Sequence, residues 1–167
     1  MGILLIRLLA YKVKETNEVY ISTDDLKQYI INKYDKVKPY KGEALYVSPE
    51  SRVYFKKGRD DFPSGTYVYS DERGYHIEYI GDKGGIVDKY DSDSFLEINF
   101  RICNELITSI AFKFCVDNRE PGKDGRRILF KKELELLSII GEEYYQMGNE
   151  RINNILQENP YDDDLLG

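Results

Sequence analysis

The chain has 167 residues and a formal net charge of −6, with 41% hydrophobic and 32% charged residues. A chain of this length buries roughly 70% of its unfolded surface, so we expect one globular domain over residues 1–167 and no intrinsic disorder. The negative charge argues against a general affinity for nucleic acid or anionic lipid and favours a basic partner.

The amino-terminal segment, residues 1–15, starts with an apolar run that Arg7 interrupts. No basic region precedes that run, so we expect no signal peptide. No later stretch reaches the roughly 18 apolar residues that a membrane-spanning helix needs, and no membrane association is expected. We expect residues 1–15 to be loosely attached to the domain and residues 162–167 to be a frayed tail.

The first predicted helix begins after Ser22, whose hydroxyl can accept hydrogen bonds from backbone N–H groups at the start of a helix. Asp24 and Asp25 complement the positive end of the helix dipole. Apolar and aromatic side chains follow at helical spacing, and Pro39 ends the pattern because proline disfavours helical geometry in the residue before it. The sequence thus predicts one amino-terminal helix.

A series of short segments with a period of two follows this helix, separated by turns rich in glycine, proline and aspartate. The connections are too short to contain a crossover helix, so we expect an antiparallel β-meander of about five strands. The predicted strands are residues 44–48, 52–56, 66–70, 75–80 and 85–88.

Three helical segments make up the carboxy-terminal half. Ser94 and Glu97 form the S-x-x-E pattern of a reciprocal helix cap, and a long apolar stripe follows over residues 95–114. Asp124 is expected to cap the second of these helices, and Gly141 to separate it from the third. The predicted fold class is therefore α+β, with the β-meander packed against the helical half.

The two cysteines, Cys103 and Cys115, lie within the long predicted helix. A helix rises about 1.5 Å per residue, so the two thiols are roughly 18 Å apart and cannot form a disulfide with each other. Unpaired thiols without metal-ligand spacing are typical of a reducing compartment, which predicts a cytoplasmic protein.

No group of residues in the sequence forms a convincing catalytic constellation. His76, the only histidine, shares a strand face with Glu78, but no nucleophile motif accompanies the pair, so we expect a surface or edge polar residue without a catalytic role. Asp91 and Asp93 have an alternating spacing seen in calcium loops but lack the other ligands, so helix capping is the preferred interpretation. We expect no metal and no cofactor.

Negative charge is concentrated between residues 60 and 98, which hold ten acidic and three basic residues, whereas residues 1–60 are net positive. Tyrosines lie among these acids. A surface of tyrosines and carboxylates suits a basic protein partner, since the rings add apolar contact area and the carboxylates steer association. The alternative is that the acids keep the turns soluble while the tyrosines alternate into the core.

Three stretches carry motifs of a known family. The first stretch is carboxy-terminal and has two parts: residues 125–137 read GRRILFKKELELL, and residues 158–163 read ENPYDD. The predicted hairpin at residues 69–74 reads YSDERG, and the long helix over residues 95–114 precedes the arginine pair. These features resemble the immunity proteins of bacterial polymorphic toxin systems, specifically immunity protein family 63. Similar proteins carry an arginine pair, a Leu-Glu-Leu-Leu helix, an Asn-Pro-Tyr-like ending and a Tyr-x-Glu-Lys-Gly hairpin, from which this hairpin departs by one inserted residue and by arginine for lysine.

The resemblance spans roughly residues 44–163 and implies a cytoplasmic α+β protein that is not an enzyme. Such a protein binds a cognate toxin domain and occludes its active site, and a nuclease toxin fits the charge. Arg126 and Arg127 are expected to brace carboxylates of the sheet, because arginines at the start of a helix oppose its dipole. The expected toxin-binding residues are acids and tyrosines of the sheet region: Asp60, Asp61, Tyr69, Asp71, Glu72, Tyr75, Glu78 and Asp82.

Two other classes of function stay open. A small metal-dependent hydrolase is possible if at least three acids gather in one pocket to bind magnesium, and the candidates are Asp60, Asp61, Asp91 and Asp93. A non-catalytic adaptor protein would have a binding surface but no toxin encoded beside it.

Overall fold

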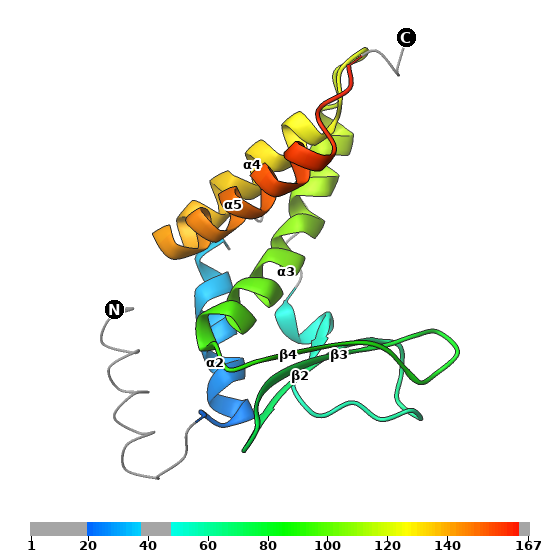
Figure 1. The fold of residues 1–167 in the computed structure, drawn as a ribbon, viewed down its shortest axis with the longest axis vertical. Helices are drawn as coiled ribbons and strands as arrows, with labels where there is room; N and C mark the ends of the chain where they lie inside the picture. The colour runs from blue at the N-terminus through cyan, green and yellow to red at the C-terminus, as the bar shows by residue number, and fades with distance from the viewer. Residues whose placement is uncertain (1–19, 38–47, 164–167) are drawn as a thin grey trace. The chain divides into compact units, whose positions relative to one another are not determined.

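The computed structural model describes residues 20–37 and 48–163 and divides into two compact units. Of the described residues, the sheet unit holds 20–31 and 48–99, and the helical unit holds 32–37 and 100–163. Helices α2 (Thr23–Tyr34) and α3 (Phe95–Asp117) each begin in the sheet unit and end in the helical unit (Figure 1). The single domain over residues 1–167 stays a prediction.

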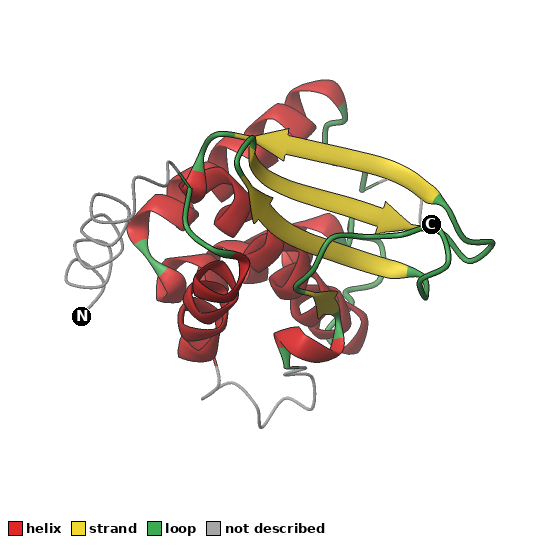
Figure 2. Cartoon of the chain, turned by 90° about the horizontal axis from the view of Figure 1, so that it is seen from below, coloured by secondary structure: helices red, strands yellow, loops and turns green. Residues whose placement is uncertain are grey.

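The sheet unit contains a four-stranded sheet in the order β1-β2-β3-β4 (Figure 2). The strands are β1 (Val53–Tyr54), β2 (Gly65–Asp71), β3 (Gly74–Ile80) and β4 (Ile86–Ser92), and a 3-10 turn, η2 (Pro49–Ser51), precedes β1. The α+β class is confirmed, as are the antiparallel pairs β2–β3 and β3–β4.

The prediction of an all-antiparallel meander is wrong at the first strand, because β1 pairs with β2 in parallel. Residues 55–64 separate the two strands, which is enough chain to return along the sheet before β2 begins. The sheet is therefore mixed. Most of the further predicted strand, residues 44–47, lies outside the described residues.

Helix α2 is anchored to one face of the sheet. The Ser70 backbone N–H donates to Thr23 Oγ1 at 3.0 Å, and the ring of Tyr75 lies edge-on to that of Tyr20 with centroids 5.3 Å apart. Ser22 caps the helix as predicted, since its hydroxyl accepts the backbone N–H of Asp25 at 3.2 Å. This face thus holds the sheet against the start of α2.

The connection between β1 and β2 contacts the opposite face of the sheet. The ring of Phe62 stacks on Tyr67 with centroids 5.7 Å apart, and Tyr54 stacks on the same ring at 4.7 Å. Tyr67 Oη also donates to the Pro63 carbonyl at 2.8 Å. Tyr67 is fully buried as a result.

Strand β4 is the last strand of the described sheet, and its backbone carries a local hydrogen bond. The Lys89 N–H donates to the carboxylate of the preceding residue, Asp88, at 2.8 Å. The pairing with β3 is irregular between Tyr79 and Ile80. Four of the seven residues of the strand are exposed, and Val87 is 68% exposed.

The start of α3 carries half of the predicted cap. Glu97 N–H donates to Ser94 Oγ at 3.2 Å, as expected. The Glu97 carboxylate accepts instead from Ser92 Oγ at 2.9 Å and from Tyr90 Oη, while the Ser94 N–H donates to Ser92 Oγ at 3.0 Å. In a reciprocal cap the Glu97 carboxylate would accept from the Ser94 N–H. Here Ser92, at the end of β4, accepts from that N–H instead.

The helical unit packs α3 with α4 (Arg126–Ile140) and α5 (Glu142–Glu158), and Gly141 separates α4 from α5 as predicted. Helices α4 and α5 lie side by side (Figure 1). They approach so closely that a Cβ at Gly148 would lie 2.3 Å from Leu137 Cδ1. Cys103 and Cys115 are both free, as expected. The fully buried apolar side chains of this unit include Ile102, Ile107, Leu136, Leu137, Ile140 and Tyr144.

A buried carboxylate joins the three helices. Glu133 on α4 is 1% exposed; it accepts a hydrogen bond from Thr108 Oγ1 of α3 at 2.6 Å and pairs with Arg151 of α5 at 2.5 Å. A buried carboxylate needs such partners to offset its lost hydration. The three side chains therefore fix the helices against one another.

The arginine pair is bound within the helical unit, so its expected role in bracing carboxylates of the sheet is wrong. Arg126 pairs with Asp124 and donates to the carbonyls of Asn159 and Pro160 at 2.8 and 2.7 Å. Arg127 pairs with Asp163 at 2.8 Å. Within the expected frayed tail, the Asp162 N–H donates to Asp124 at 3.1 Å, and residues 164–167 lie outside the described part of the chain.

Candidate functional site

Most of the expected toxin-binding acids fall into two groups at opposite ends of the sheet, and Glu78 lies between them on β3. Asp71 and Glu72 lie at the turn between β2 and β3. At the other end, the Gly85 N–H donates to the Asp60 carbonyl at 3.2 Å, which brings Asp60 beside the turn that carries Asp82. The strand between these ends, β3, has seven residues and spans roughly 20 Å.

Exposure separates the expected contact residues into two classes. Asp60, Asp61, Glu72 and Asp82 are exposed. Tyr69, Tyr75 and Glu78 are 6%, 4% and 2% exposed, and Tyr75 lies on the face anchored to α2. The structure therefore brings some of the expected residues to the surface and packs others into the sheet unit.

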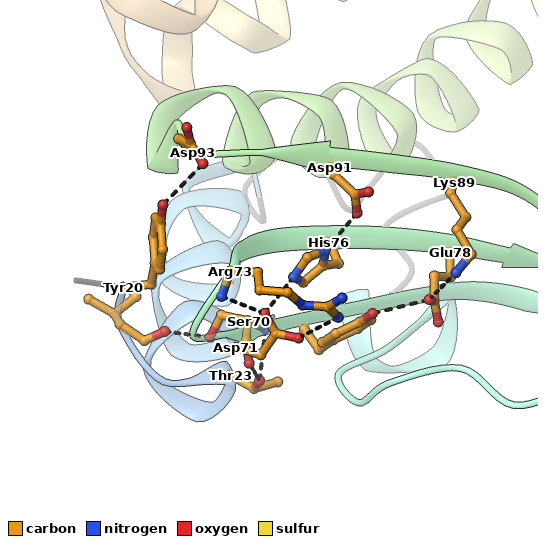
Figure 3. Close-up of polar contacts among 12 residues, drawn as sticks. Tyr20, Thr23, Ser70, Asp71, Arg73, His76, Glu78, Lys89, Asp91 and Asp93 are labelled. Atoms are coloured by element: carbon orange, nitrogen blue, oxygen red, sulfur yellow. Dashed lines mark hydrogen bonds and ion pairs between the residues drawn. The ribbon is translucent and has the colours of Figure 1, made fainter. Parts of the chain in front are cut away.

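Glu78 lies at the centre of a hydrogen-bonded cluster on the face opposite α2 (Figure 3). Its carboxylate accepts from Tyr69 Oη at 3.1 Å and from the Gly58 N–H at 2.9 Å, and it pairs with Lys89 Nζ at 3.2 Å. Burial, and then the hydrogen bond to Glu78, raise the pKa of Tyr69 above its usual value. The tyrosine therefore stays a neutral donor to the carboxylate.

His76 lies in the adjacent row of the same face, between two carboxylates (Figure 3). Its Nδ1 is 2.6 Å from Asp91 Oδ1, and its Nε2 is 2.9 Å from Asp71 Oδ1. The ring of Tyr69 stacks on the imidazole with centroids 4.6 Å apart. His76 is only 5% exposed, so its prediction as a surface or edge residue is wrong. We call Tyr69, Asp71, His76 and Asp91 the His76 cluster.

Whether the contacts of His76 are hydrogen bonds depends on which atoms of the His76 cluster carry hydrogen. The Arg73 guanidinium and backbone N–H, followed by His76, hold the pKa of Asp71 well below its usual range, so this carboxylate is ionised at neutral pH. An ionised carboxylate only accepts hydrogen bonds. When the Asp91 carboxylate is ionised as well, both contacts are hydrogen bonds only if both ring nitrogens carry hydrogen, which is the imidazolium form.

The prediction that Asp91 and Asp93 cap a helix is wrong. Asp91 binds His76, and Asp93 accepts a hydrogen bond from Tyr20 Oη at 3.0 Å. The pairing of His76 with Asp91 follows from the register of β3 with β4, in which the two residues face each other. The sequence signal was the alternation along residues 86–92, but the predicted strand ended at residue 88 and missed the pair.

The described residues do not form a metal site. Among residues 20–37 and 48–163, no group of three or more histidine, cysteine, aspartate or glutamate side chains is placed to hold a metal ion. Of the acids considered for magnesium, Asp61 pairs with Arg59 at 3.3 Å, while Asp91 and Asp93 bind His76 and Tyr20. Within the same ranges, no helix has the length and apolar character needed to cross a membrane.

Comparison with known proteins gives a family match. The family model described as Immunity protein 63 matches residues 69–154, which is more than half of the chain. The matched segment runs from β2 to α5 and contains the whole His76 cluster and Glu133. No curated protein matches the chain, and no solved structure does.

Proposed function

The chain belongs to the immunity protein 63 family, and on this premise we propose that it binds a cognate bacterial toxin domain and neutralises it. The family match carries the proposal. The protein acts by occluding the active site of the toxin, in the cytoplasm, and it catalyses no reaction and uses no cofactor. The toxin domain is basic, and a nuclease is the class that best fits an acidic inhibitor.

Charge supports this mode of action. Residues 60–98 carry ten acidic and three basic residues, and this segment includes β2, β3 and β4. An acidic surface attracts a basic cleft over several ångströms, raises the association rate and disfavours acidic partners. The sheet unit is therefore the proposed toxin-binding part of the molecule.

The exposed acids are the proposed points of first contact. Asp60, Asp61 and Asp82 form one group and Glu72 lies at the other end of the sheet, so a toxin cleft is contacted at both ends of β3. The less exposed members of the expected set, Tyr69, Asp71, Tyr75 and Glu78, act in this proposal by holding the strands and turns that present the exposed acids.

Co-expression tests the proposed function. The toxin domain encoded beside this gene is expressed in bacteria with and without the protein, and growth is followed. We expect the toxin alone to stop growth, its co-expression with the protein to restore growth, and the two proteins to elute together on size-exclusion chromatography. Failure of both rescue and complex formation would contradict the proposal.

Charge reversal tests the proposed contact surface. Changing Asp60, Asp61 and Asp82 to lysine should slow association with the toxin about tenfold or more at low salt, because electrostatic steering is lost. The effect should shrink as salt is added. Changing Glu142, Glu150 and Glu158, at exposed positions on α5, to lysine is the charge-matched control and should leave the association rate within twofold. An equal effect of both changes would remove the sheet unit from the proposed interface.

A further inference from the structure

Asp91 differs from every other charged member of the His76 cluster in its exposure. Its side chain is 68% exposed, whereas the side chains of His76 and Asp71 are 6% and 21% exposed. The carboxylate contacts the imidazole through Oδ1. Since a carboxylate can accept about four hydrogen bonds, Asp91 has the capacity to bind a further donor while it faces solvent.

Asp71 is the matching carboxylate on the other side of the ring, and it is more completely engaged. It accepts from Arg73 NH2 at 3.0 Å, from the Arg73 backbone N–H at 2.8 Å and from His76 at 2.9 Å. A further cation would therefore meet Arg73 at this carboxylate. The two sides of the imidazole are unequal, and the exposed side is the one that an incoming group can reach.

The charges around His76 determine what happens when a cation arrives. Asp71 and the Tyr69 ring face the imidazole from β2, and Asp91 faces it from β4. Arg73 acts through Asp71, while Glu78 lies two residues farther along β3 and is paired with Lys89. The imidazolium thus has carboxylates on both of its nitrogens.

A lysine or arginine side chain bound to Asp91 would lie about 6 Å from the imidazolium. Because the Asp91 side chain is 68% exposed, the two like charges interact largely through water, and at an effective dielectric constant of about 40 to 80 their repulsion shifts a protonation equilibrium by roughly three- to tenfold. The proton on Nδ1 is the one that leaves, because it lies between the imidazole and Asp91. The neutral imidazole keeps its Nε2–H bond to Asp71, and the released proton passes to the buffer.

We propose that Asp91 is a toxin-contacting residue that binds a lysine or arginine side chain of the toxin, and that this contact favours loss of the Nδ1 proton of His76. The inference rests on the proposed function and adds a residue and a proton linkage to it. Its consequence is that the complex tightens by about three- to tenfold as pH rises through the range in which the imidazolium of the free protein is lost.

The single histidine makes the proton directly observable. We would label the imidazole of His76 with nitrogen-15 and record its resonances in the free protein and in the complex with a catalytically inactive form of the adjacent-gene toxin domain, both at a pH within the range in which the free ring loses its proton. The resonances should move toward the neutral-imidazole position in the complex. Calorimetric titration at the same pH, in buffers of different ionisation enthalpy, should show release of a fraction of one proton per complex.

Two isosteric variants separate the contact from general charge. Asp91→Asn should weaken the complex about tenfold and abolish proton release. Asp88→Asn removes a charge from the same strand. Asp88 is three positions from Asp91 and its side chain therefore lies on the opposite face of the sheet, so this variant should change the affinity less than twofold. Thermal unfolding of both variants establishes that they fold.

The outcomes distinguish this inference from the proposed function. A complex that forms with wild-type affinity for Asp91→Asn, or that forms without proton release, overturns the inference and leaves the proposed function in place. The absence of any complex between the wild-type protein and the toxin domain overturns both. A weakened Asp91→Asn complex with a normal Asp88→Asn complex and a released proton supports the inference.

Discussion

The sheet unit and the helical unit each bury a carboxylate, but they satisfy it with partners of different kinds. Glu133 in the helical unit is 1% exposed and is held by Thr108 and Arg151 from two other helices. Glu78 in the sheet unit is 2% exposed, and its ion-pair partner Lys89 is 55% exposed. A charge paired across helices stabilises their packing, whereas a charge paired with an exposed side chain leaves that partner within reach of another protein.

The largest effect is expected where the helical unit loses a partner of its buried charge. Arg151→Met removes the ion pair of Glu133 and leaves its hydrogen bond from Thr108. We expect a loss of about 3 kcal/mol in the free energy of unfolding, because a buried carboxylate without its cation is costly. Urea unfolding at neutral pH measures it. The double variant Glu133→Leu with Arg151→Met removes both charges and should recover most of the loss. A cost below about 1 kcal/mol for the single change would contradict the idea that the ion pair of Glu133 stabilises the packing of the helices.

The next effect concerns the contact between α4 and α5. A methyl group at Gly148 would lie 2.3 Å from Leu137 Cδ1, so Gly148→Ala should destabilise the protein by about 2 kcal/mol even though alanine favours helix. Leu137→Val shortens the opposing side chain, and the double variant should therefore lose less than the sum of the single losses. Additive losses in thermal unfolding would mean that the two side chains do not compete for space.

A smaller effect, shared by the two units, depends on pH. Arg73 in the sheet unit and Arg126 in the helical unit hold the pKa of Asp71 and of Asp124 below the usual range. A lowered folded-state pKa contributes stability above the unfolded value, near 4, and this contribution is lost as pH falls through the folded-state value. Asp71→Asn should cost about 1 kcal/mol at pH 7 and less as pH drops below 4. Urea unfolding at several pH values measures this, and a cost independent of pH would contradict it.

The smallest expected signal is the reaction of Cys103. Burial raises the pKa of this thiol to about 12, so it should stay unmodified by a disulfide reagent at pH 8 until the helical unit opens. The variant Cys115→Ser leaves Cys103 as the only thiol. The modification rate of Cys103 should rise over the same urea concentrations at which the helical circular dichroism signal is lost. Fast modification of the native protein would show that the helical unit opens more readily than its packing implies.

Local patterns in the sequence predicted much of the fold. The alternation of residues 66–70 and 75–80 and the turn between them predicted β2 and β3, and the long apolar stripe predicted α3. The parallel pairing of β1 could not be predicted, because a two-residue strand carries no signal of direction and its partner depends on the path of residues 55–64. Hydrophobic periodicity predicts whether a segment is a strand or a helix, whereas the strand that it pairs with depends on the path of the connecting loops.

The candidate site was less predictable because its hydrogen bonds join residues that are distant in the sequence. Glu78 and Tyr69 were selected for their charge and ring, but the hydrogen bond that Glu78 accepts from the Gly58 N–H depends on a loop 20 residues away in the sequence. Asp91 was assigned to a helix cap because the predicted strand ended too early. The pairing of Arg127 with Asp163 likewise needs the chain to return beside the start of α4.

The local hydrogen bond in β4 has a consequence for the protein at high concentration. An open strand offers N–H groups to any other strand, and such contacts lead to fibres and precipitation. The carboxylate of Asp88 occupies the N–H of Lys89, and the lysine side chain adds a charge beside it. Asp88→Ala would leave the Lys89 N–H without this acceptor. We expect solutions of the variant to become turbid at a lower protein concentration than solutions of the wild-type protein.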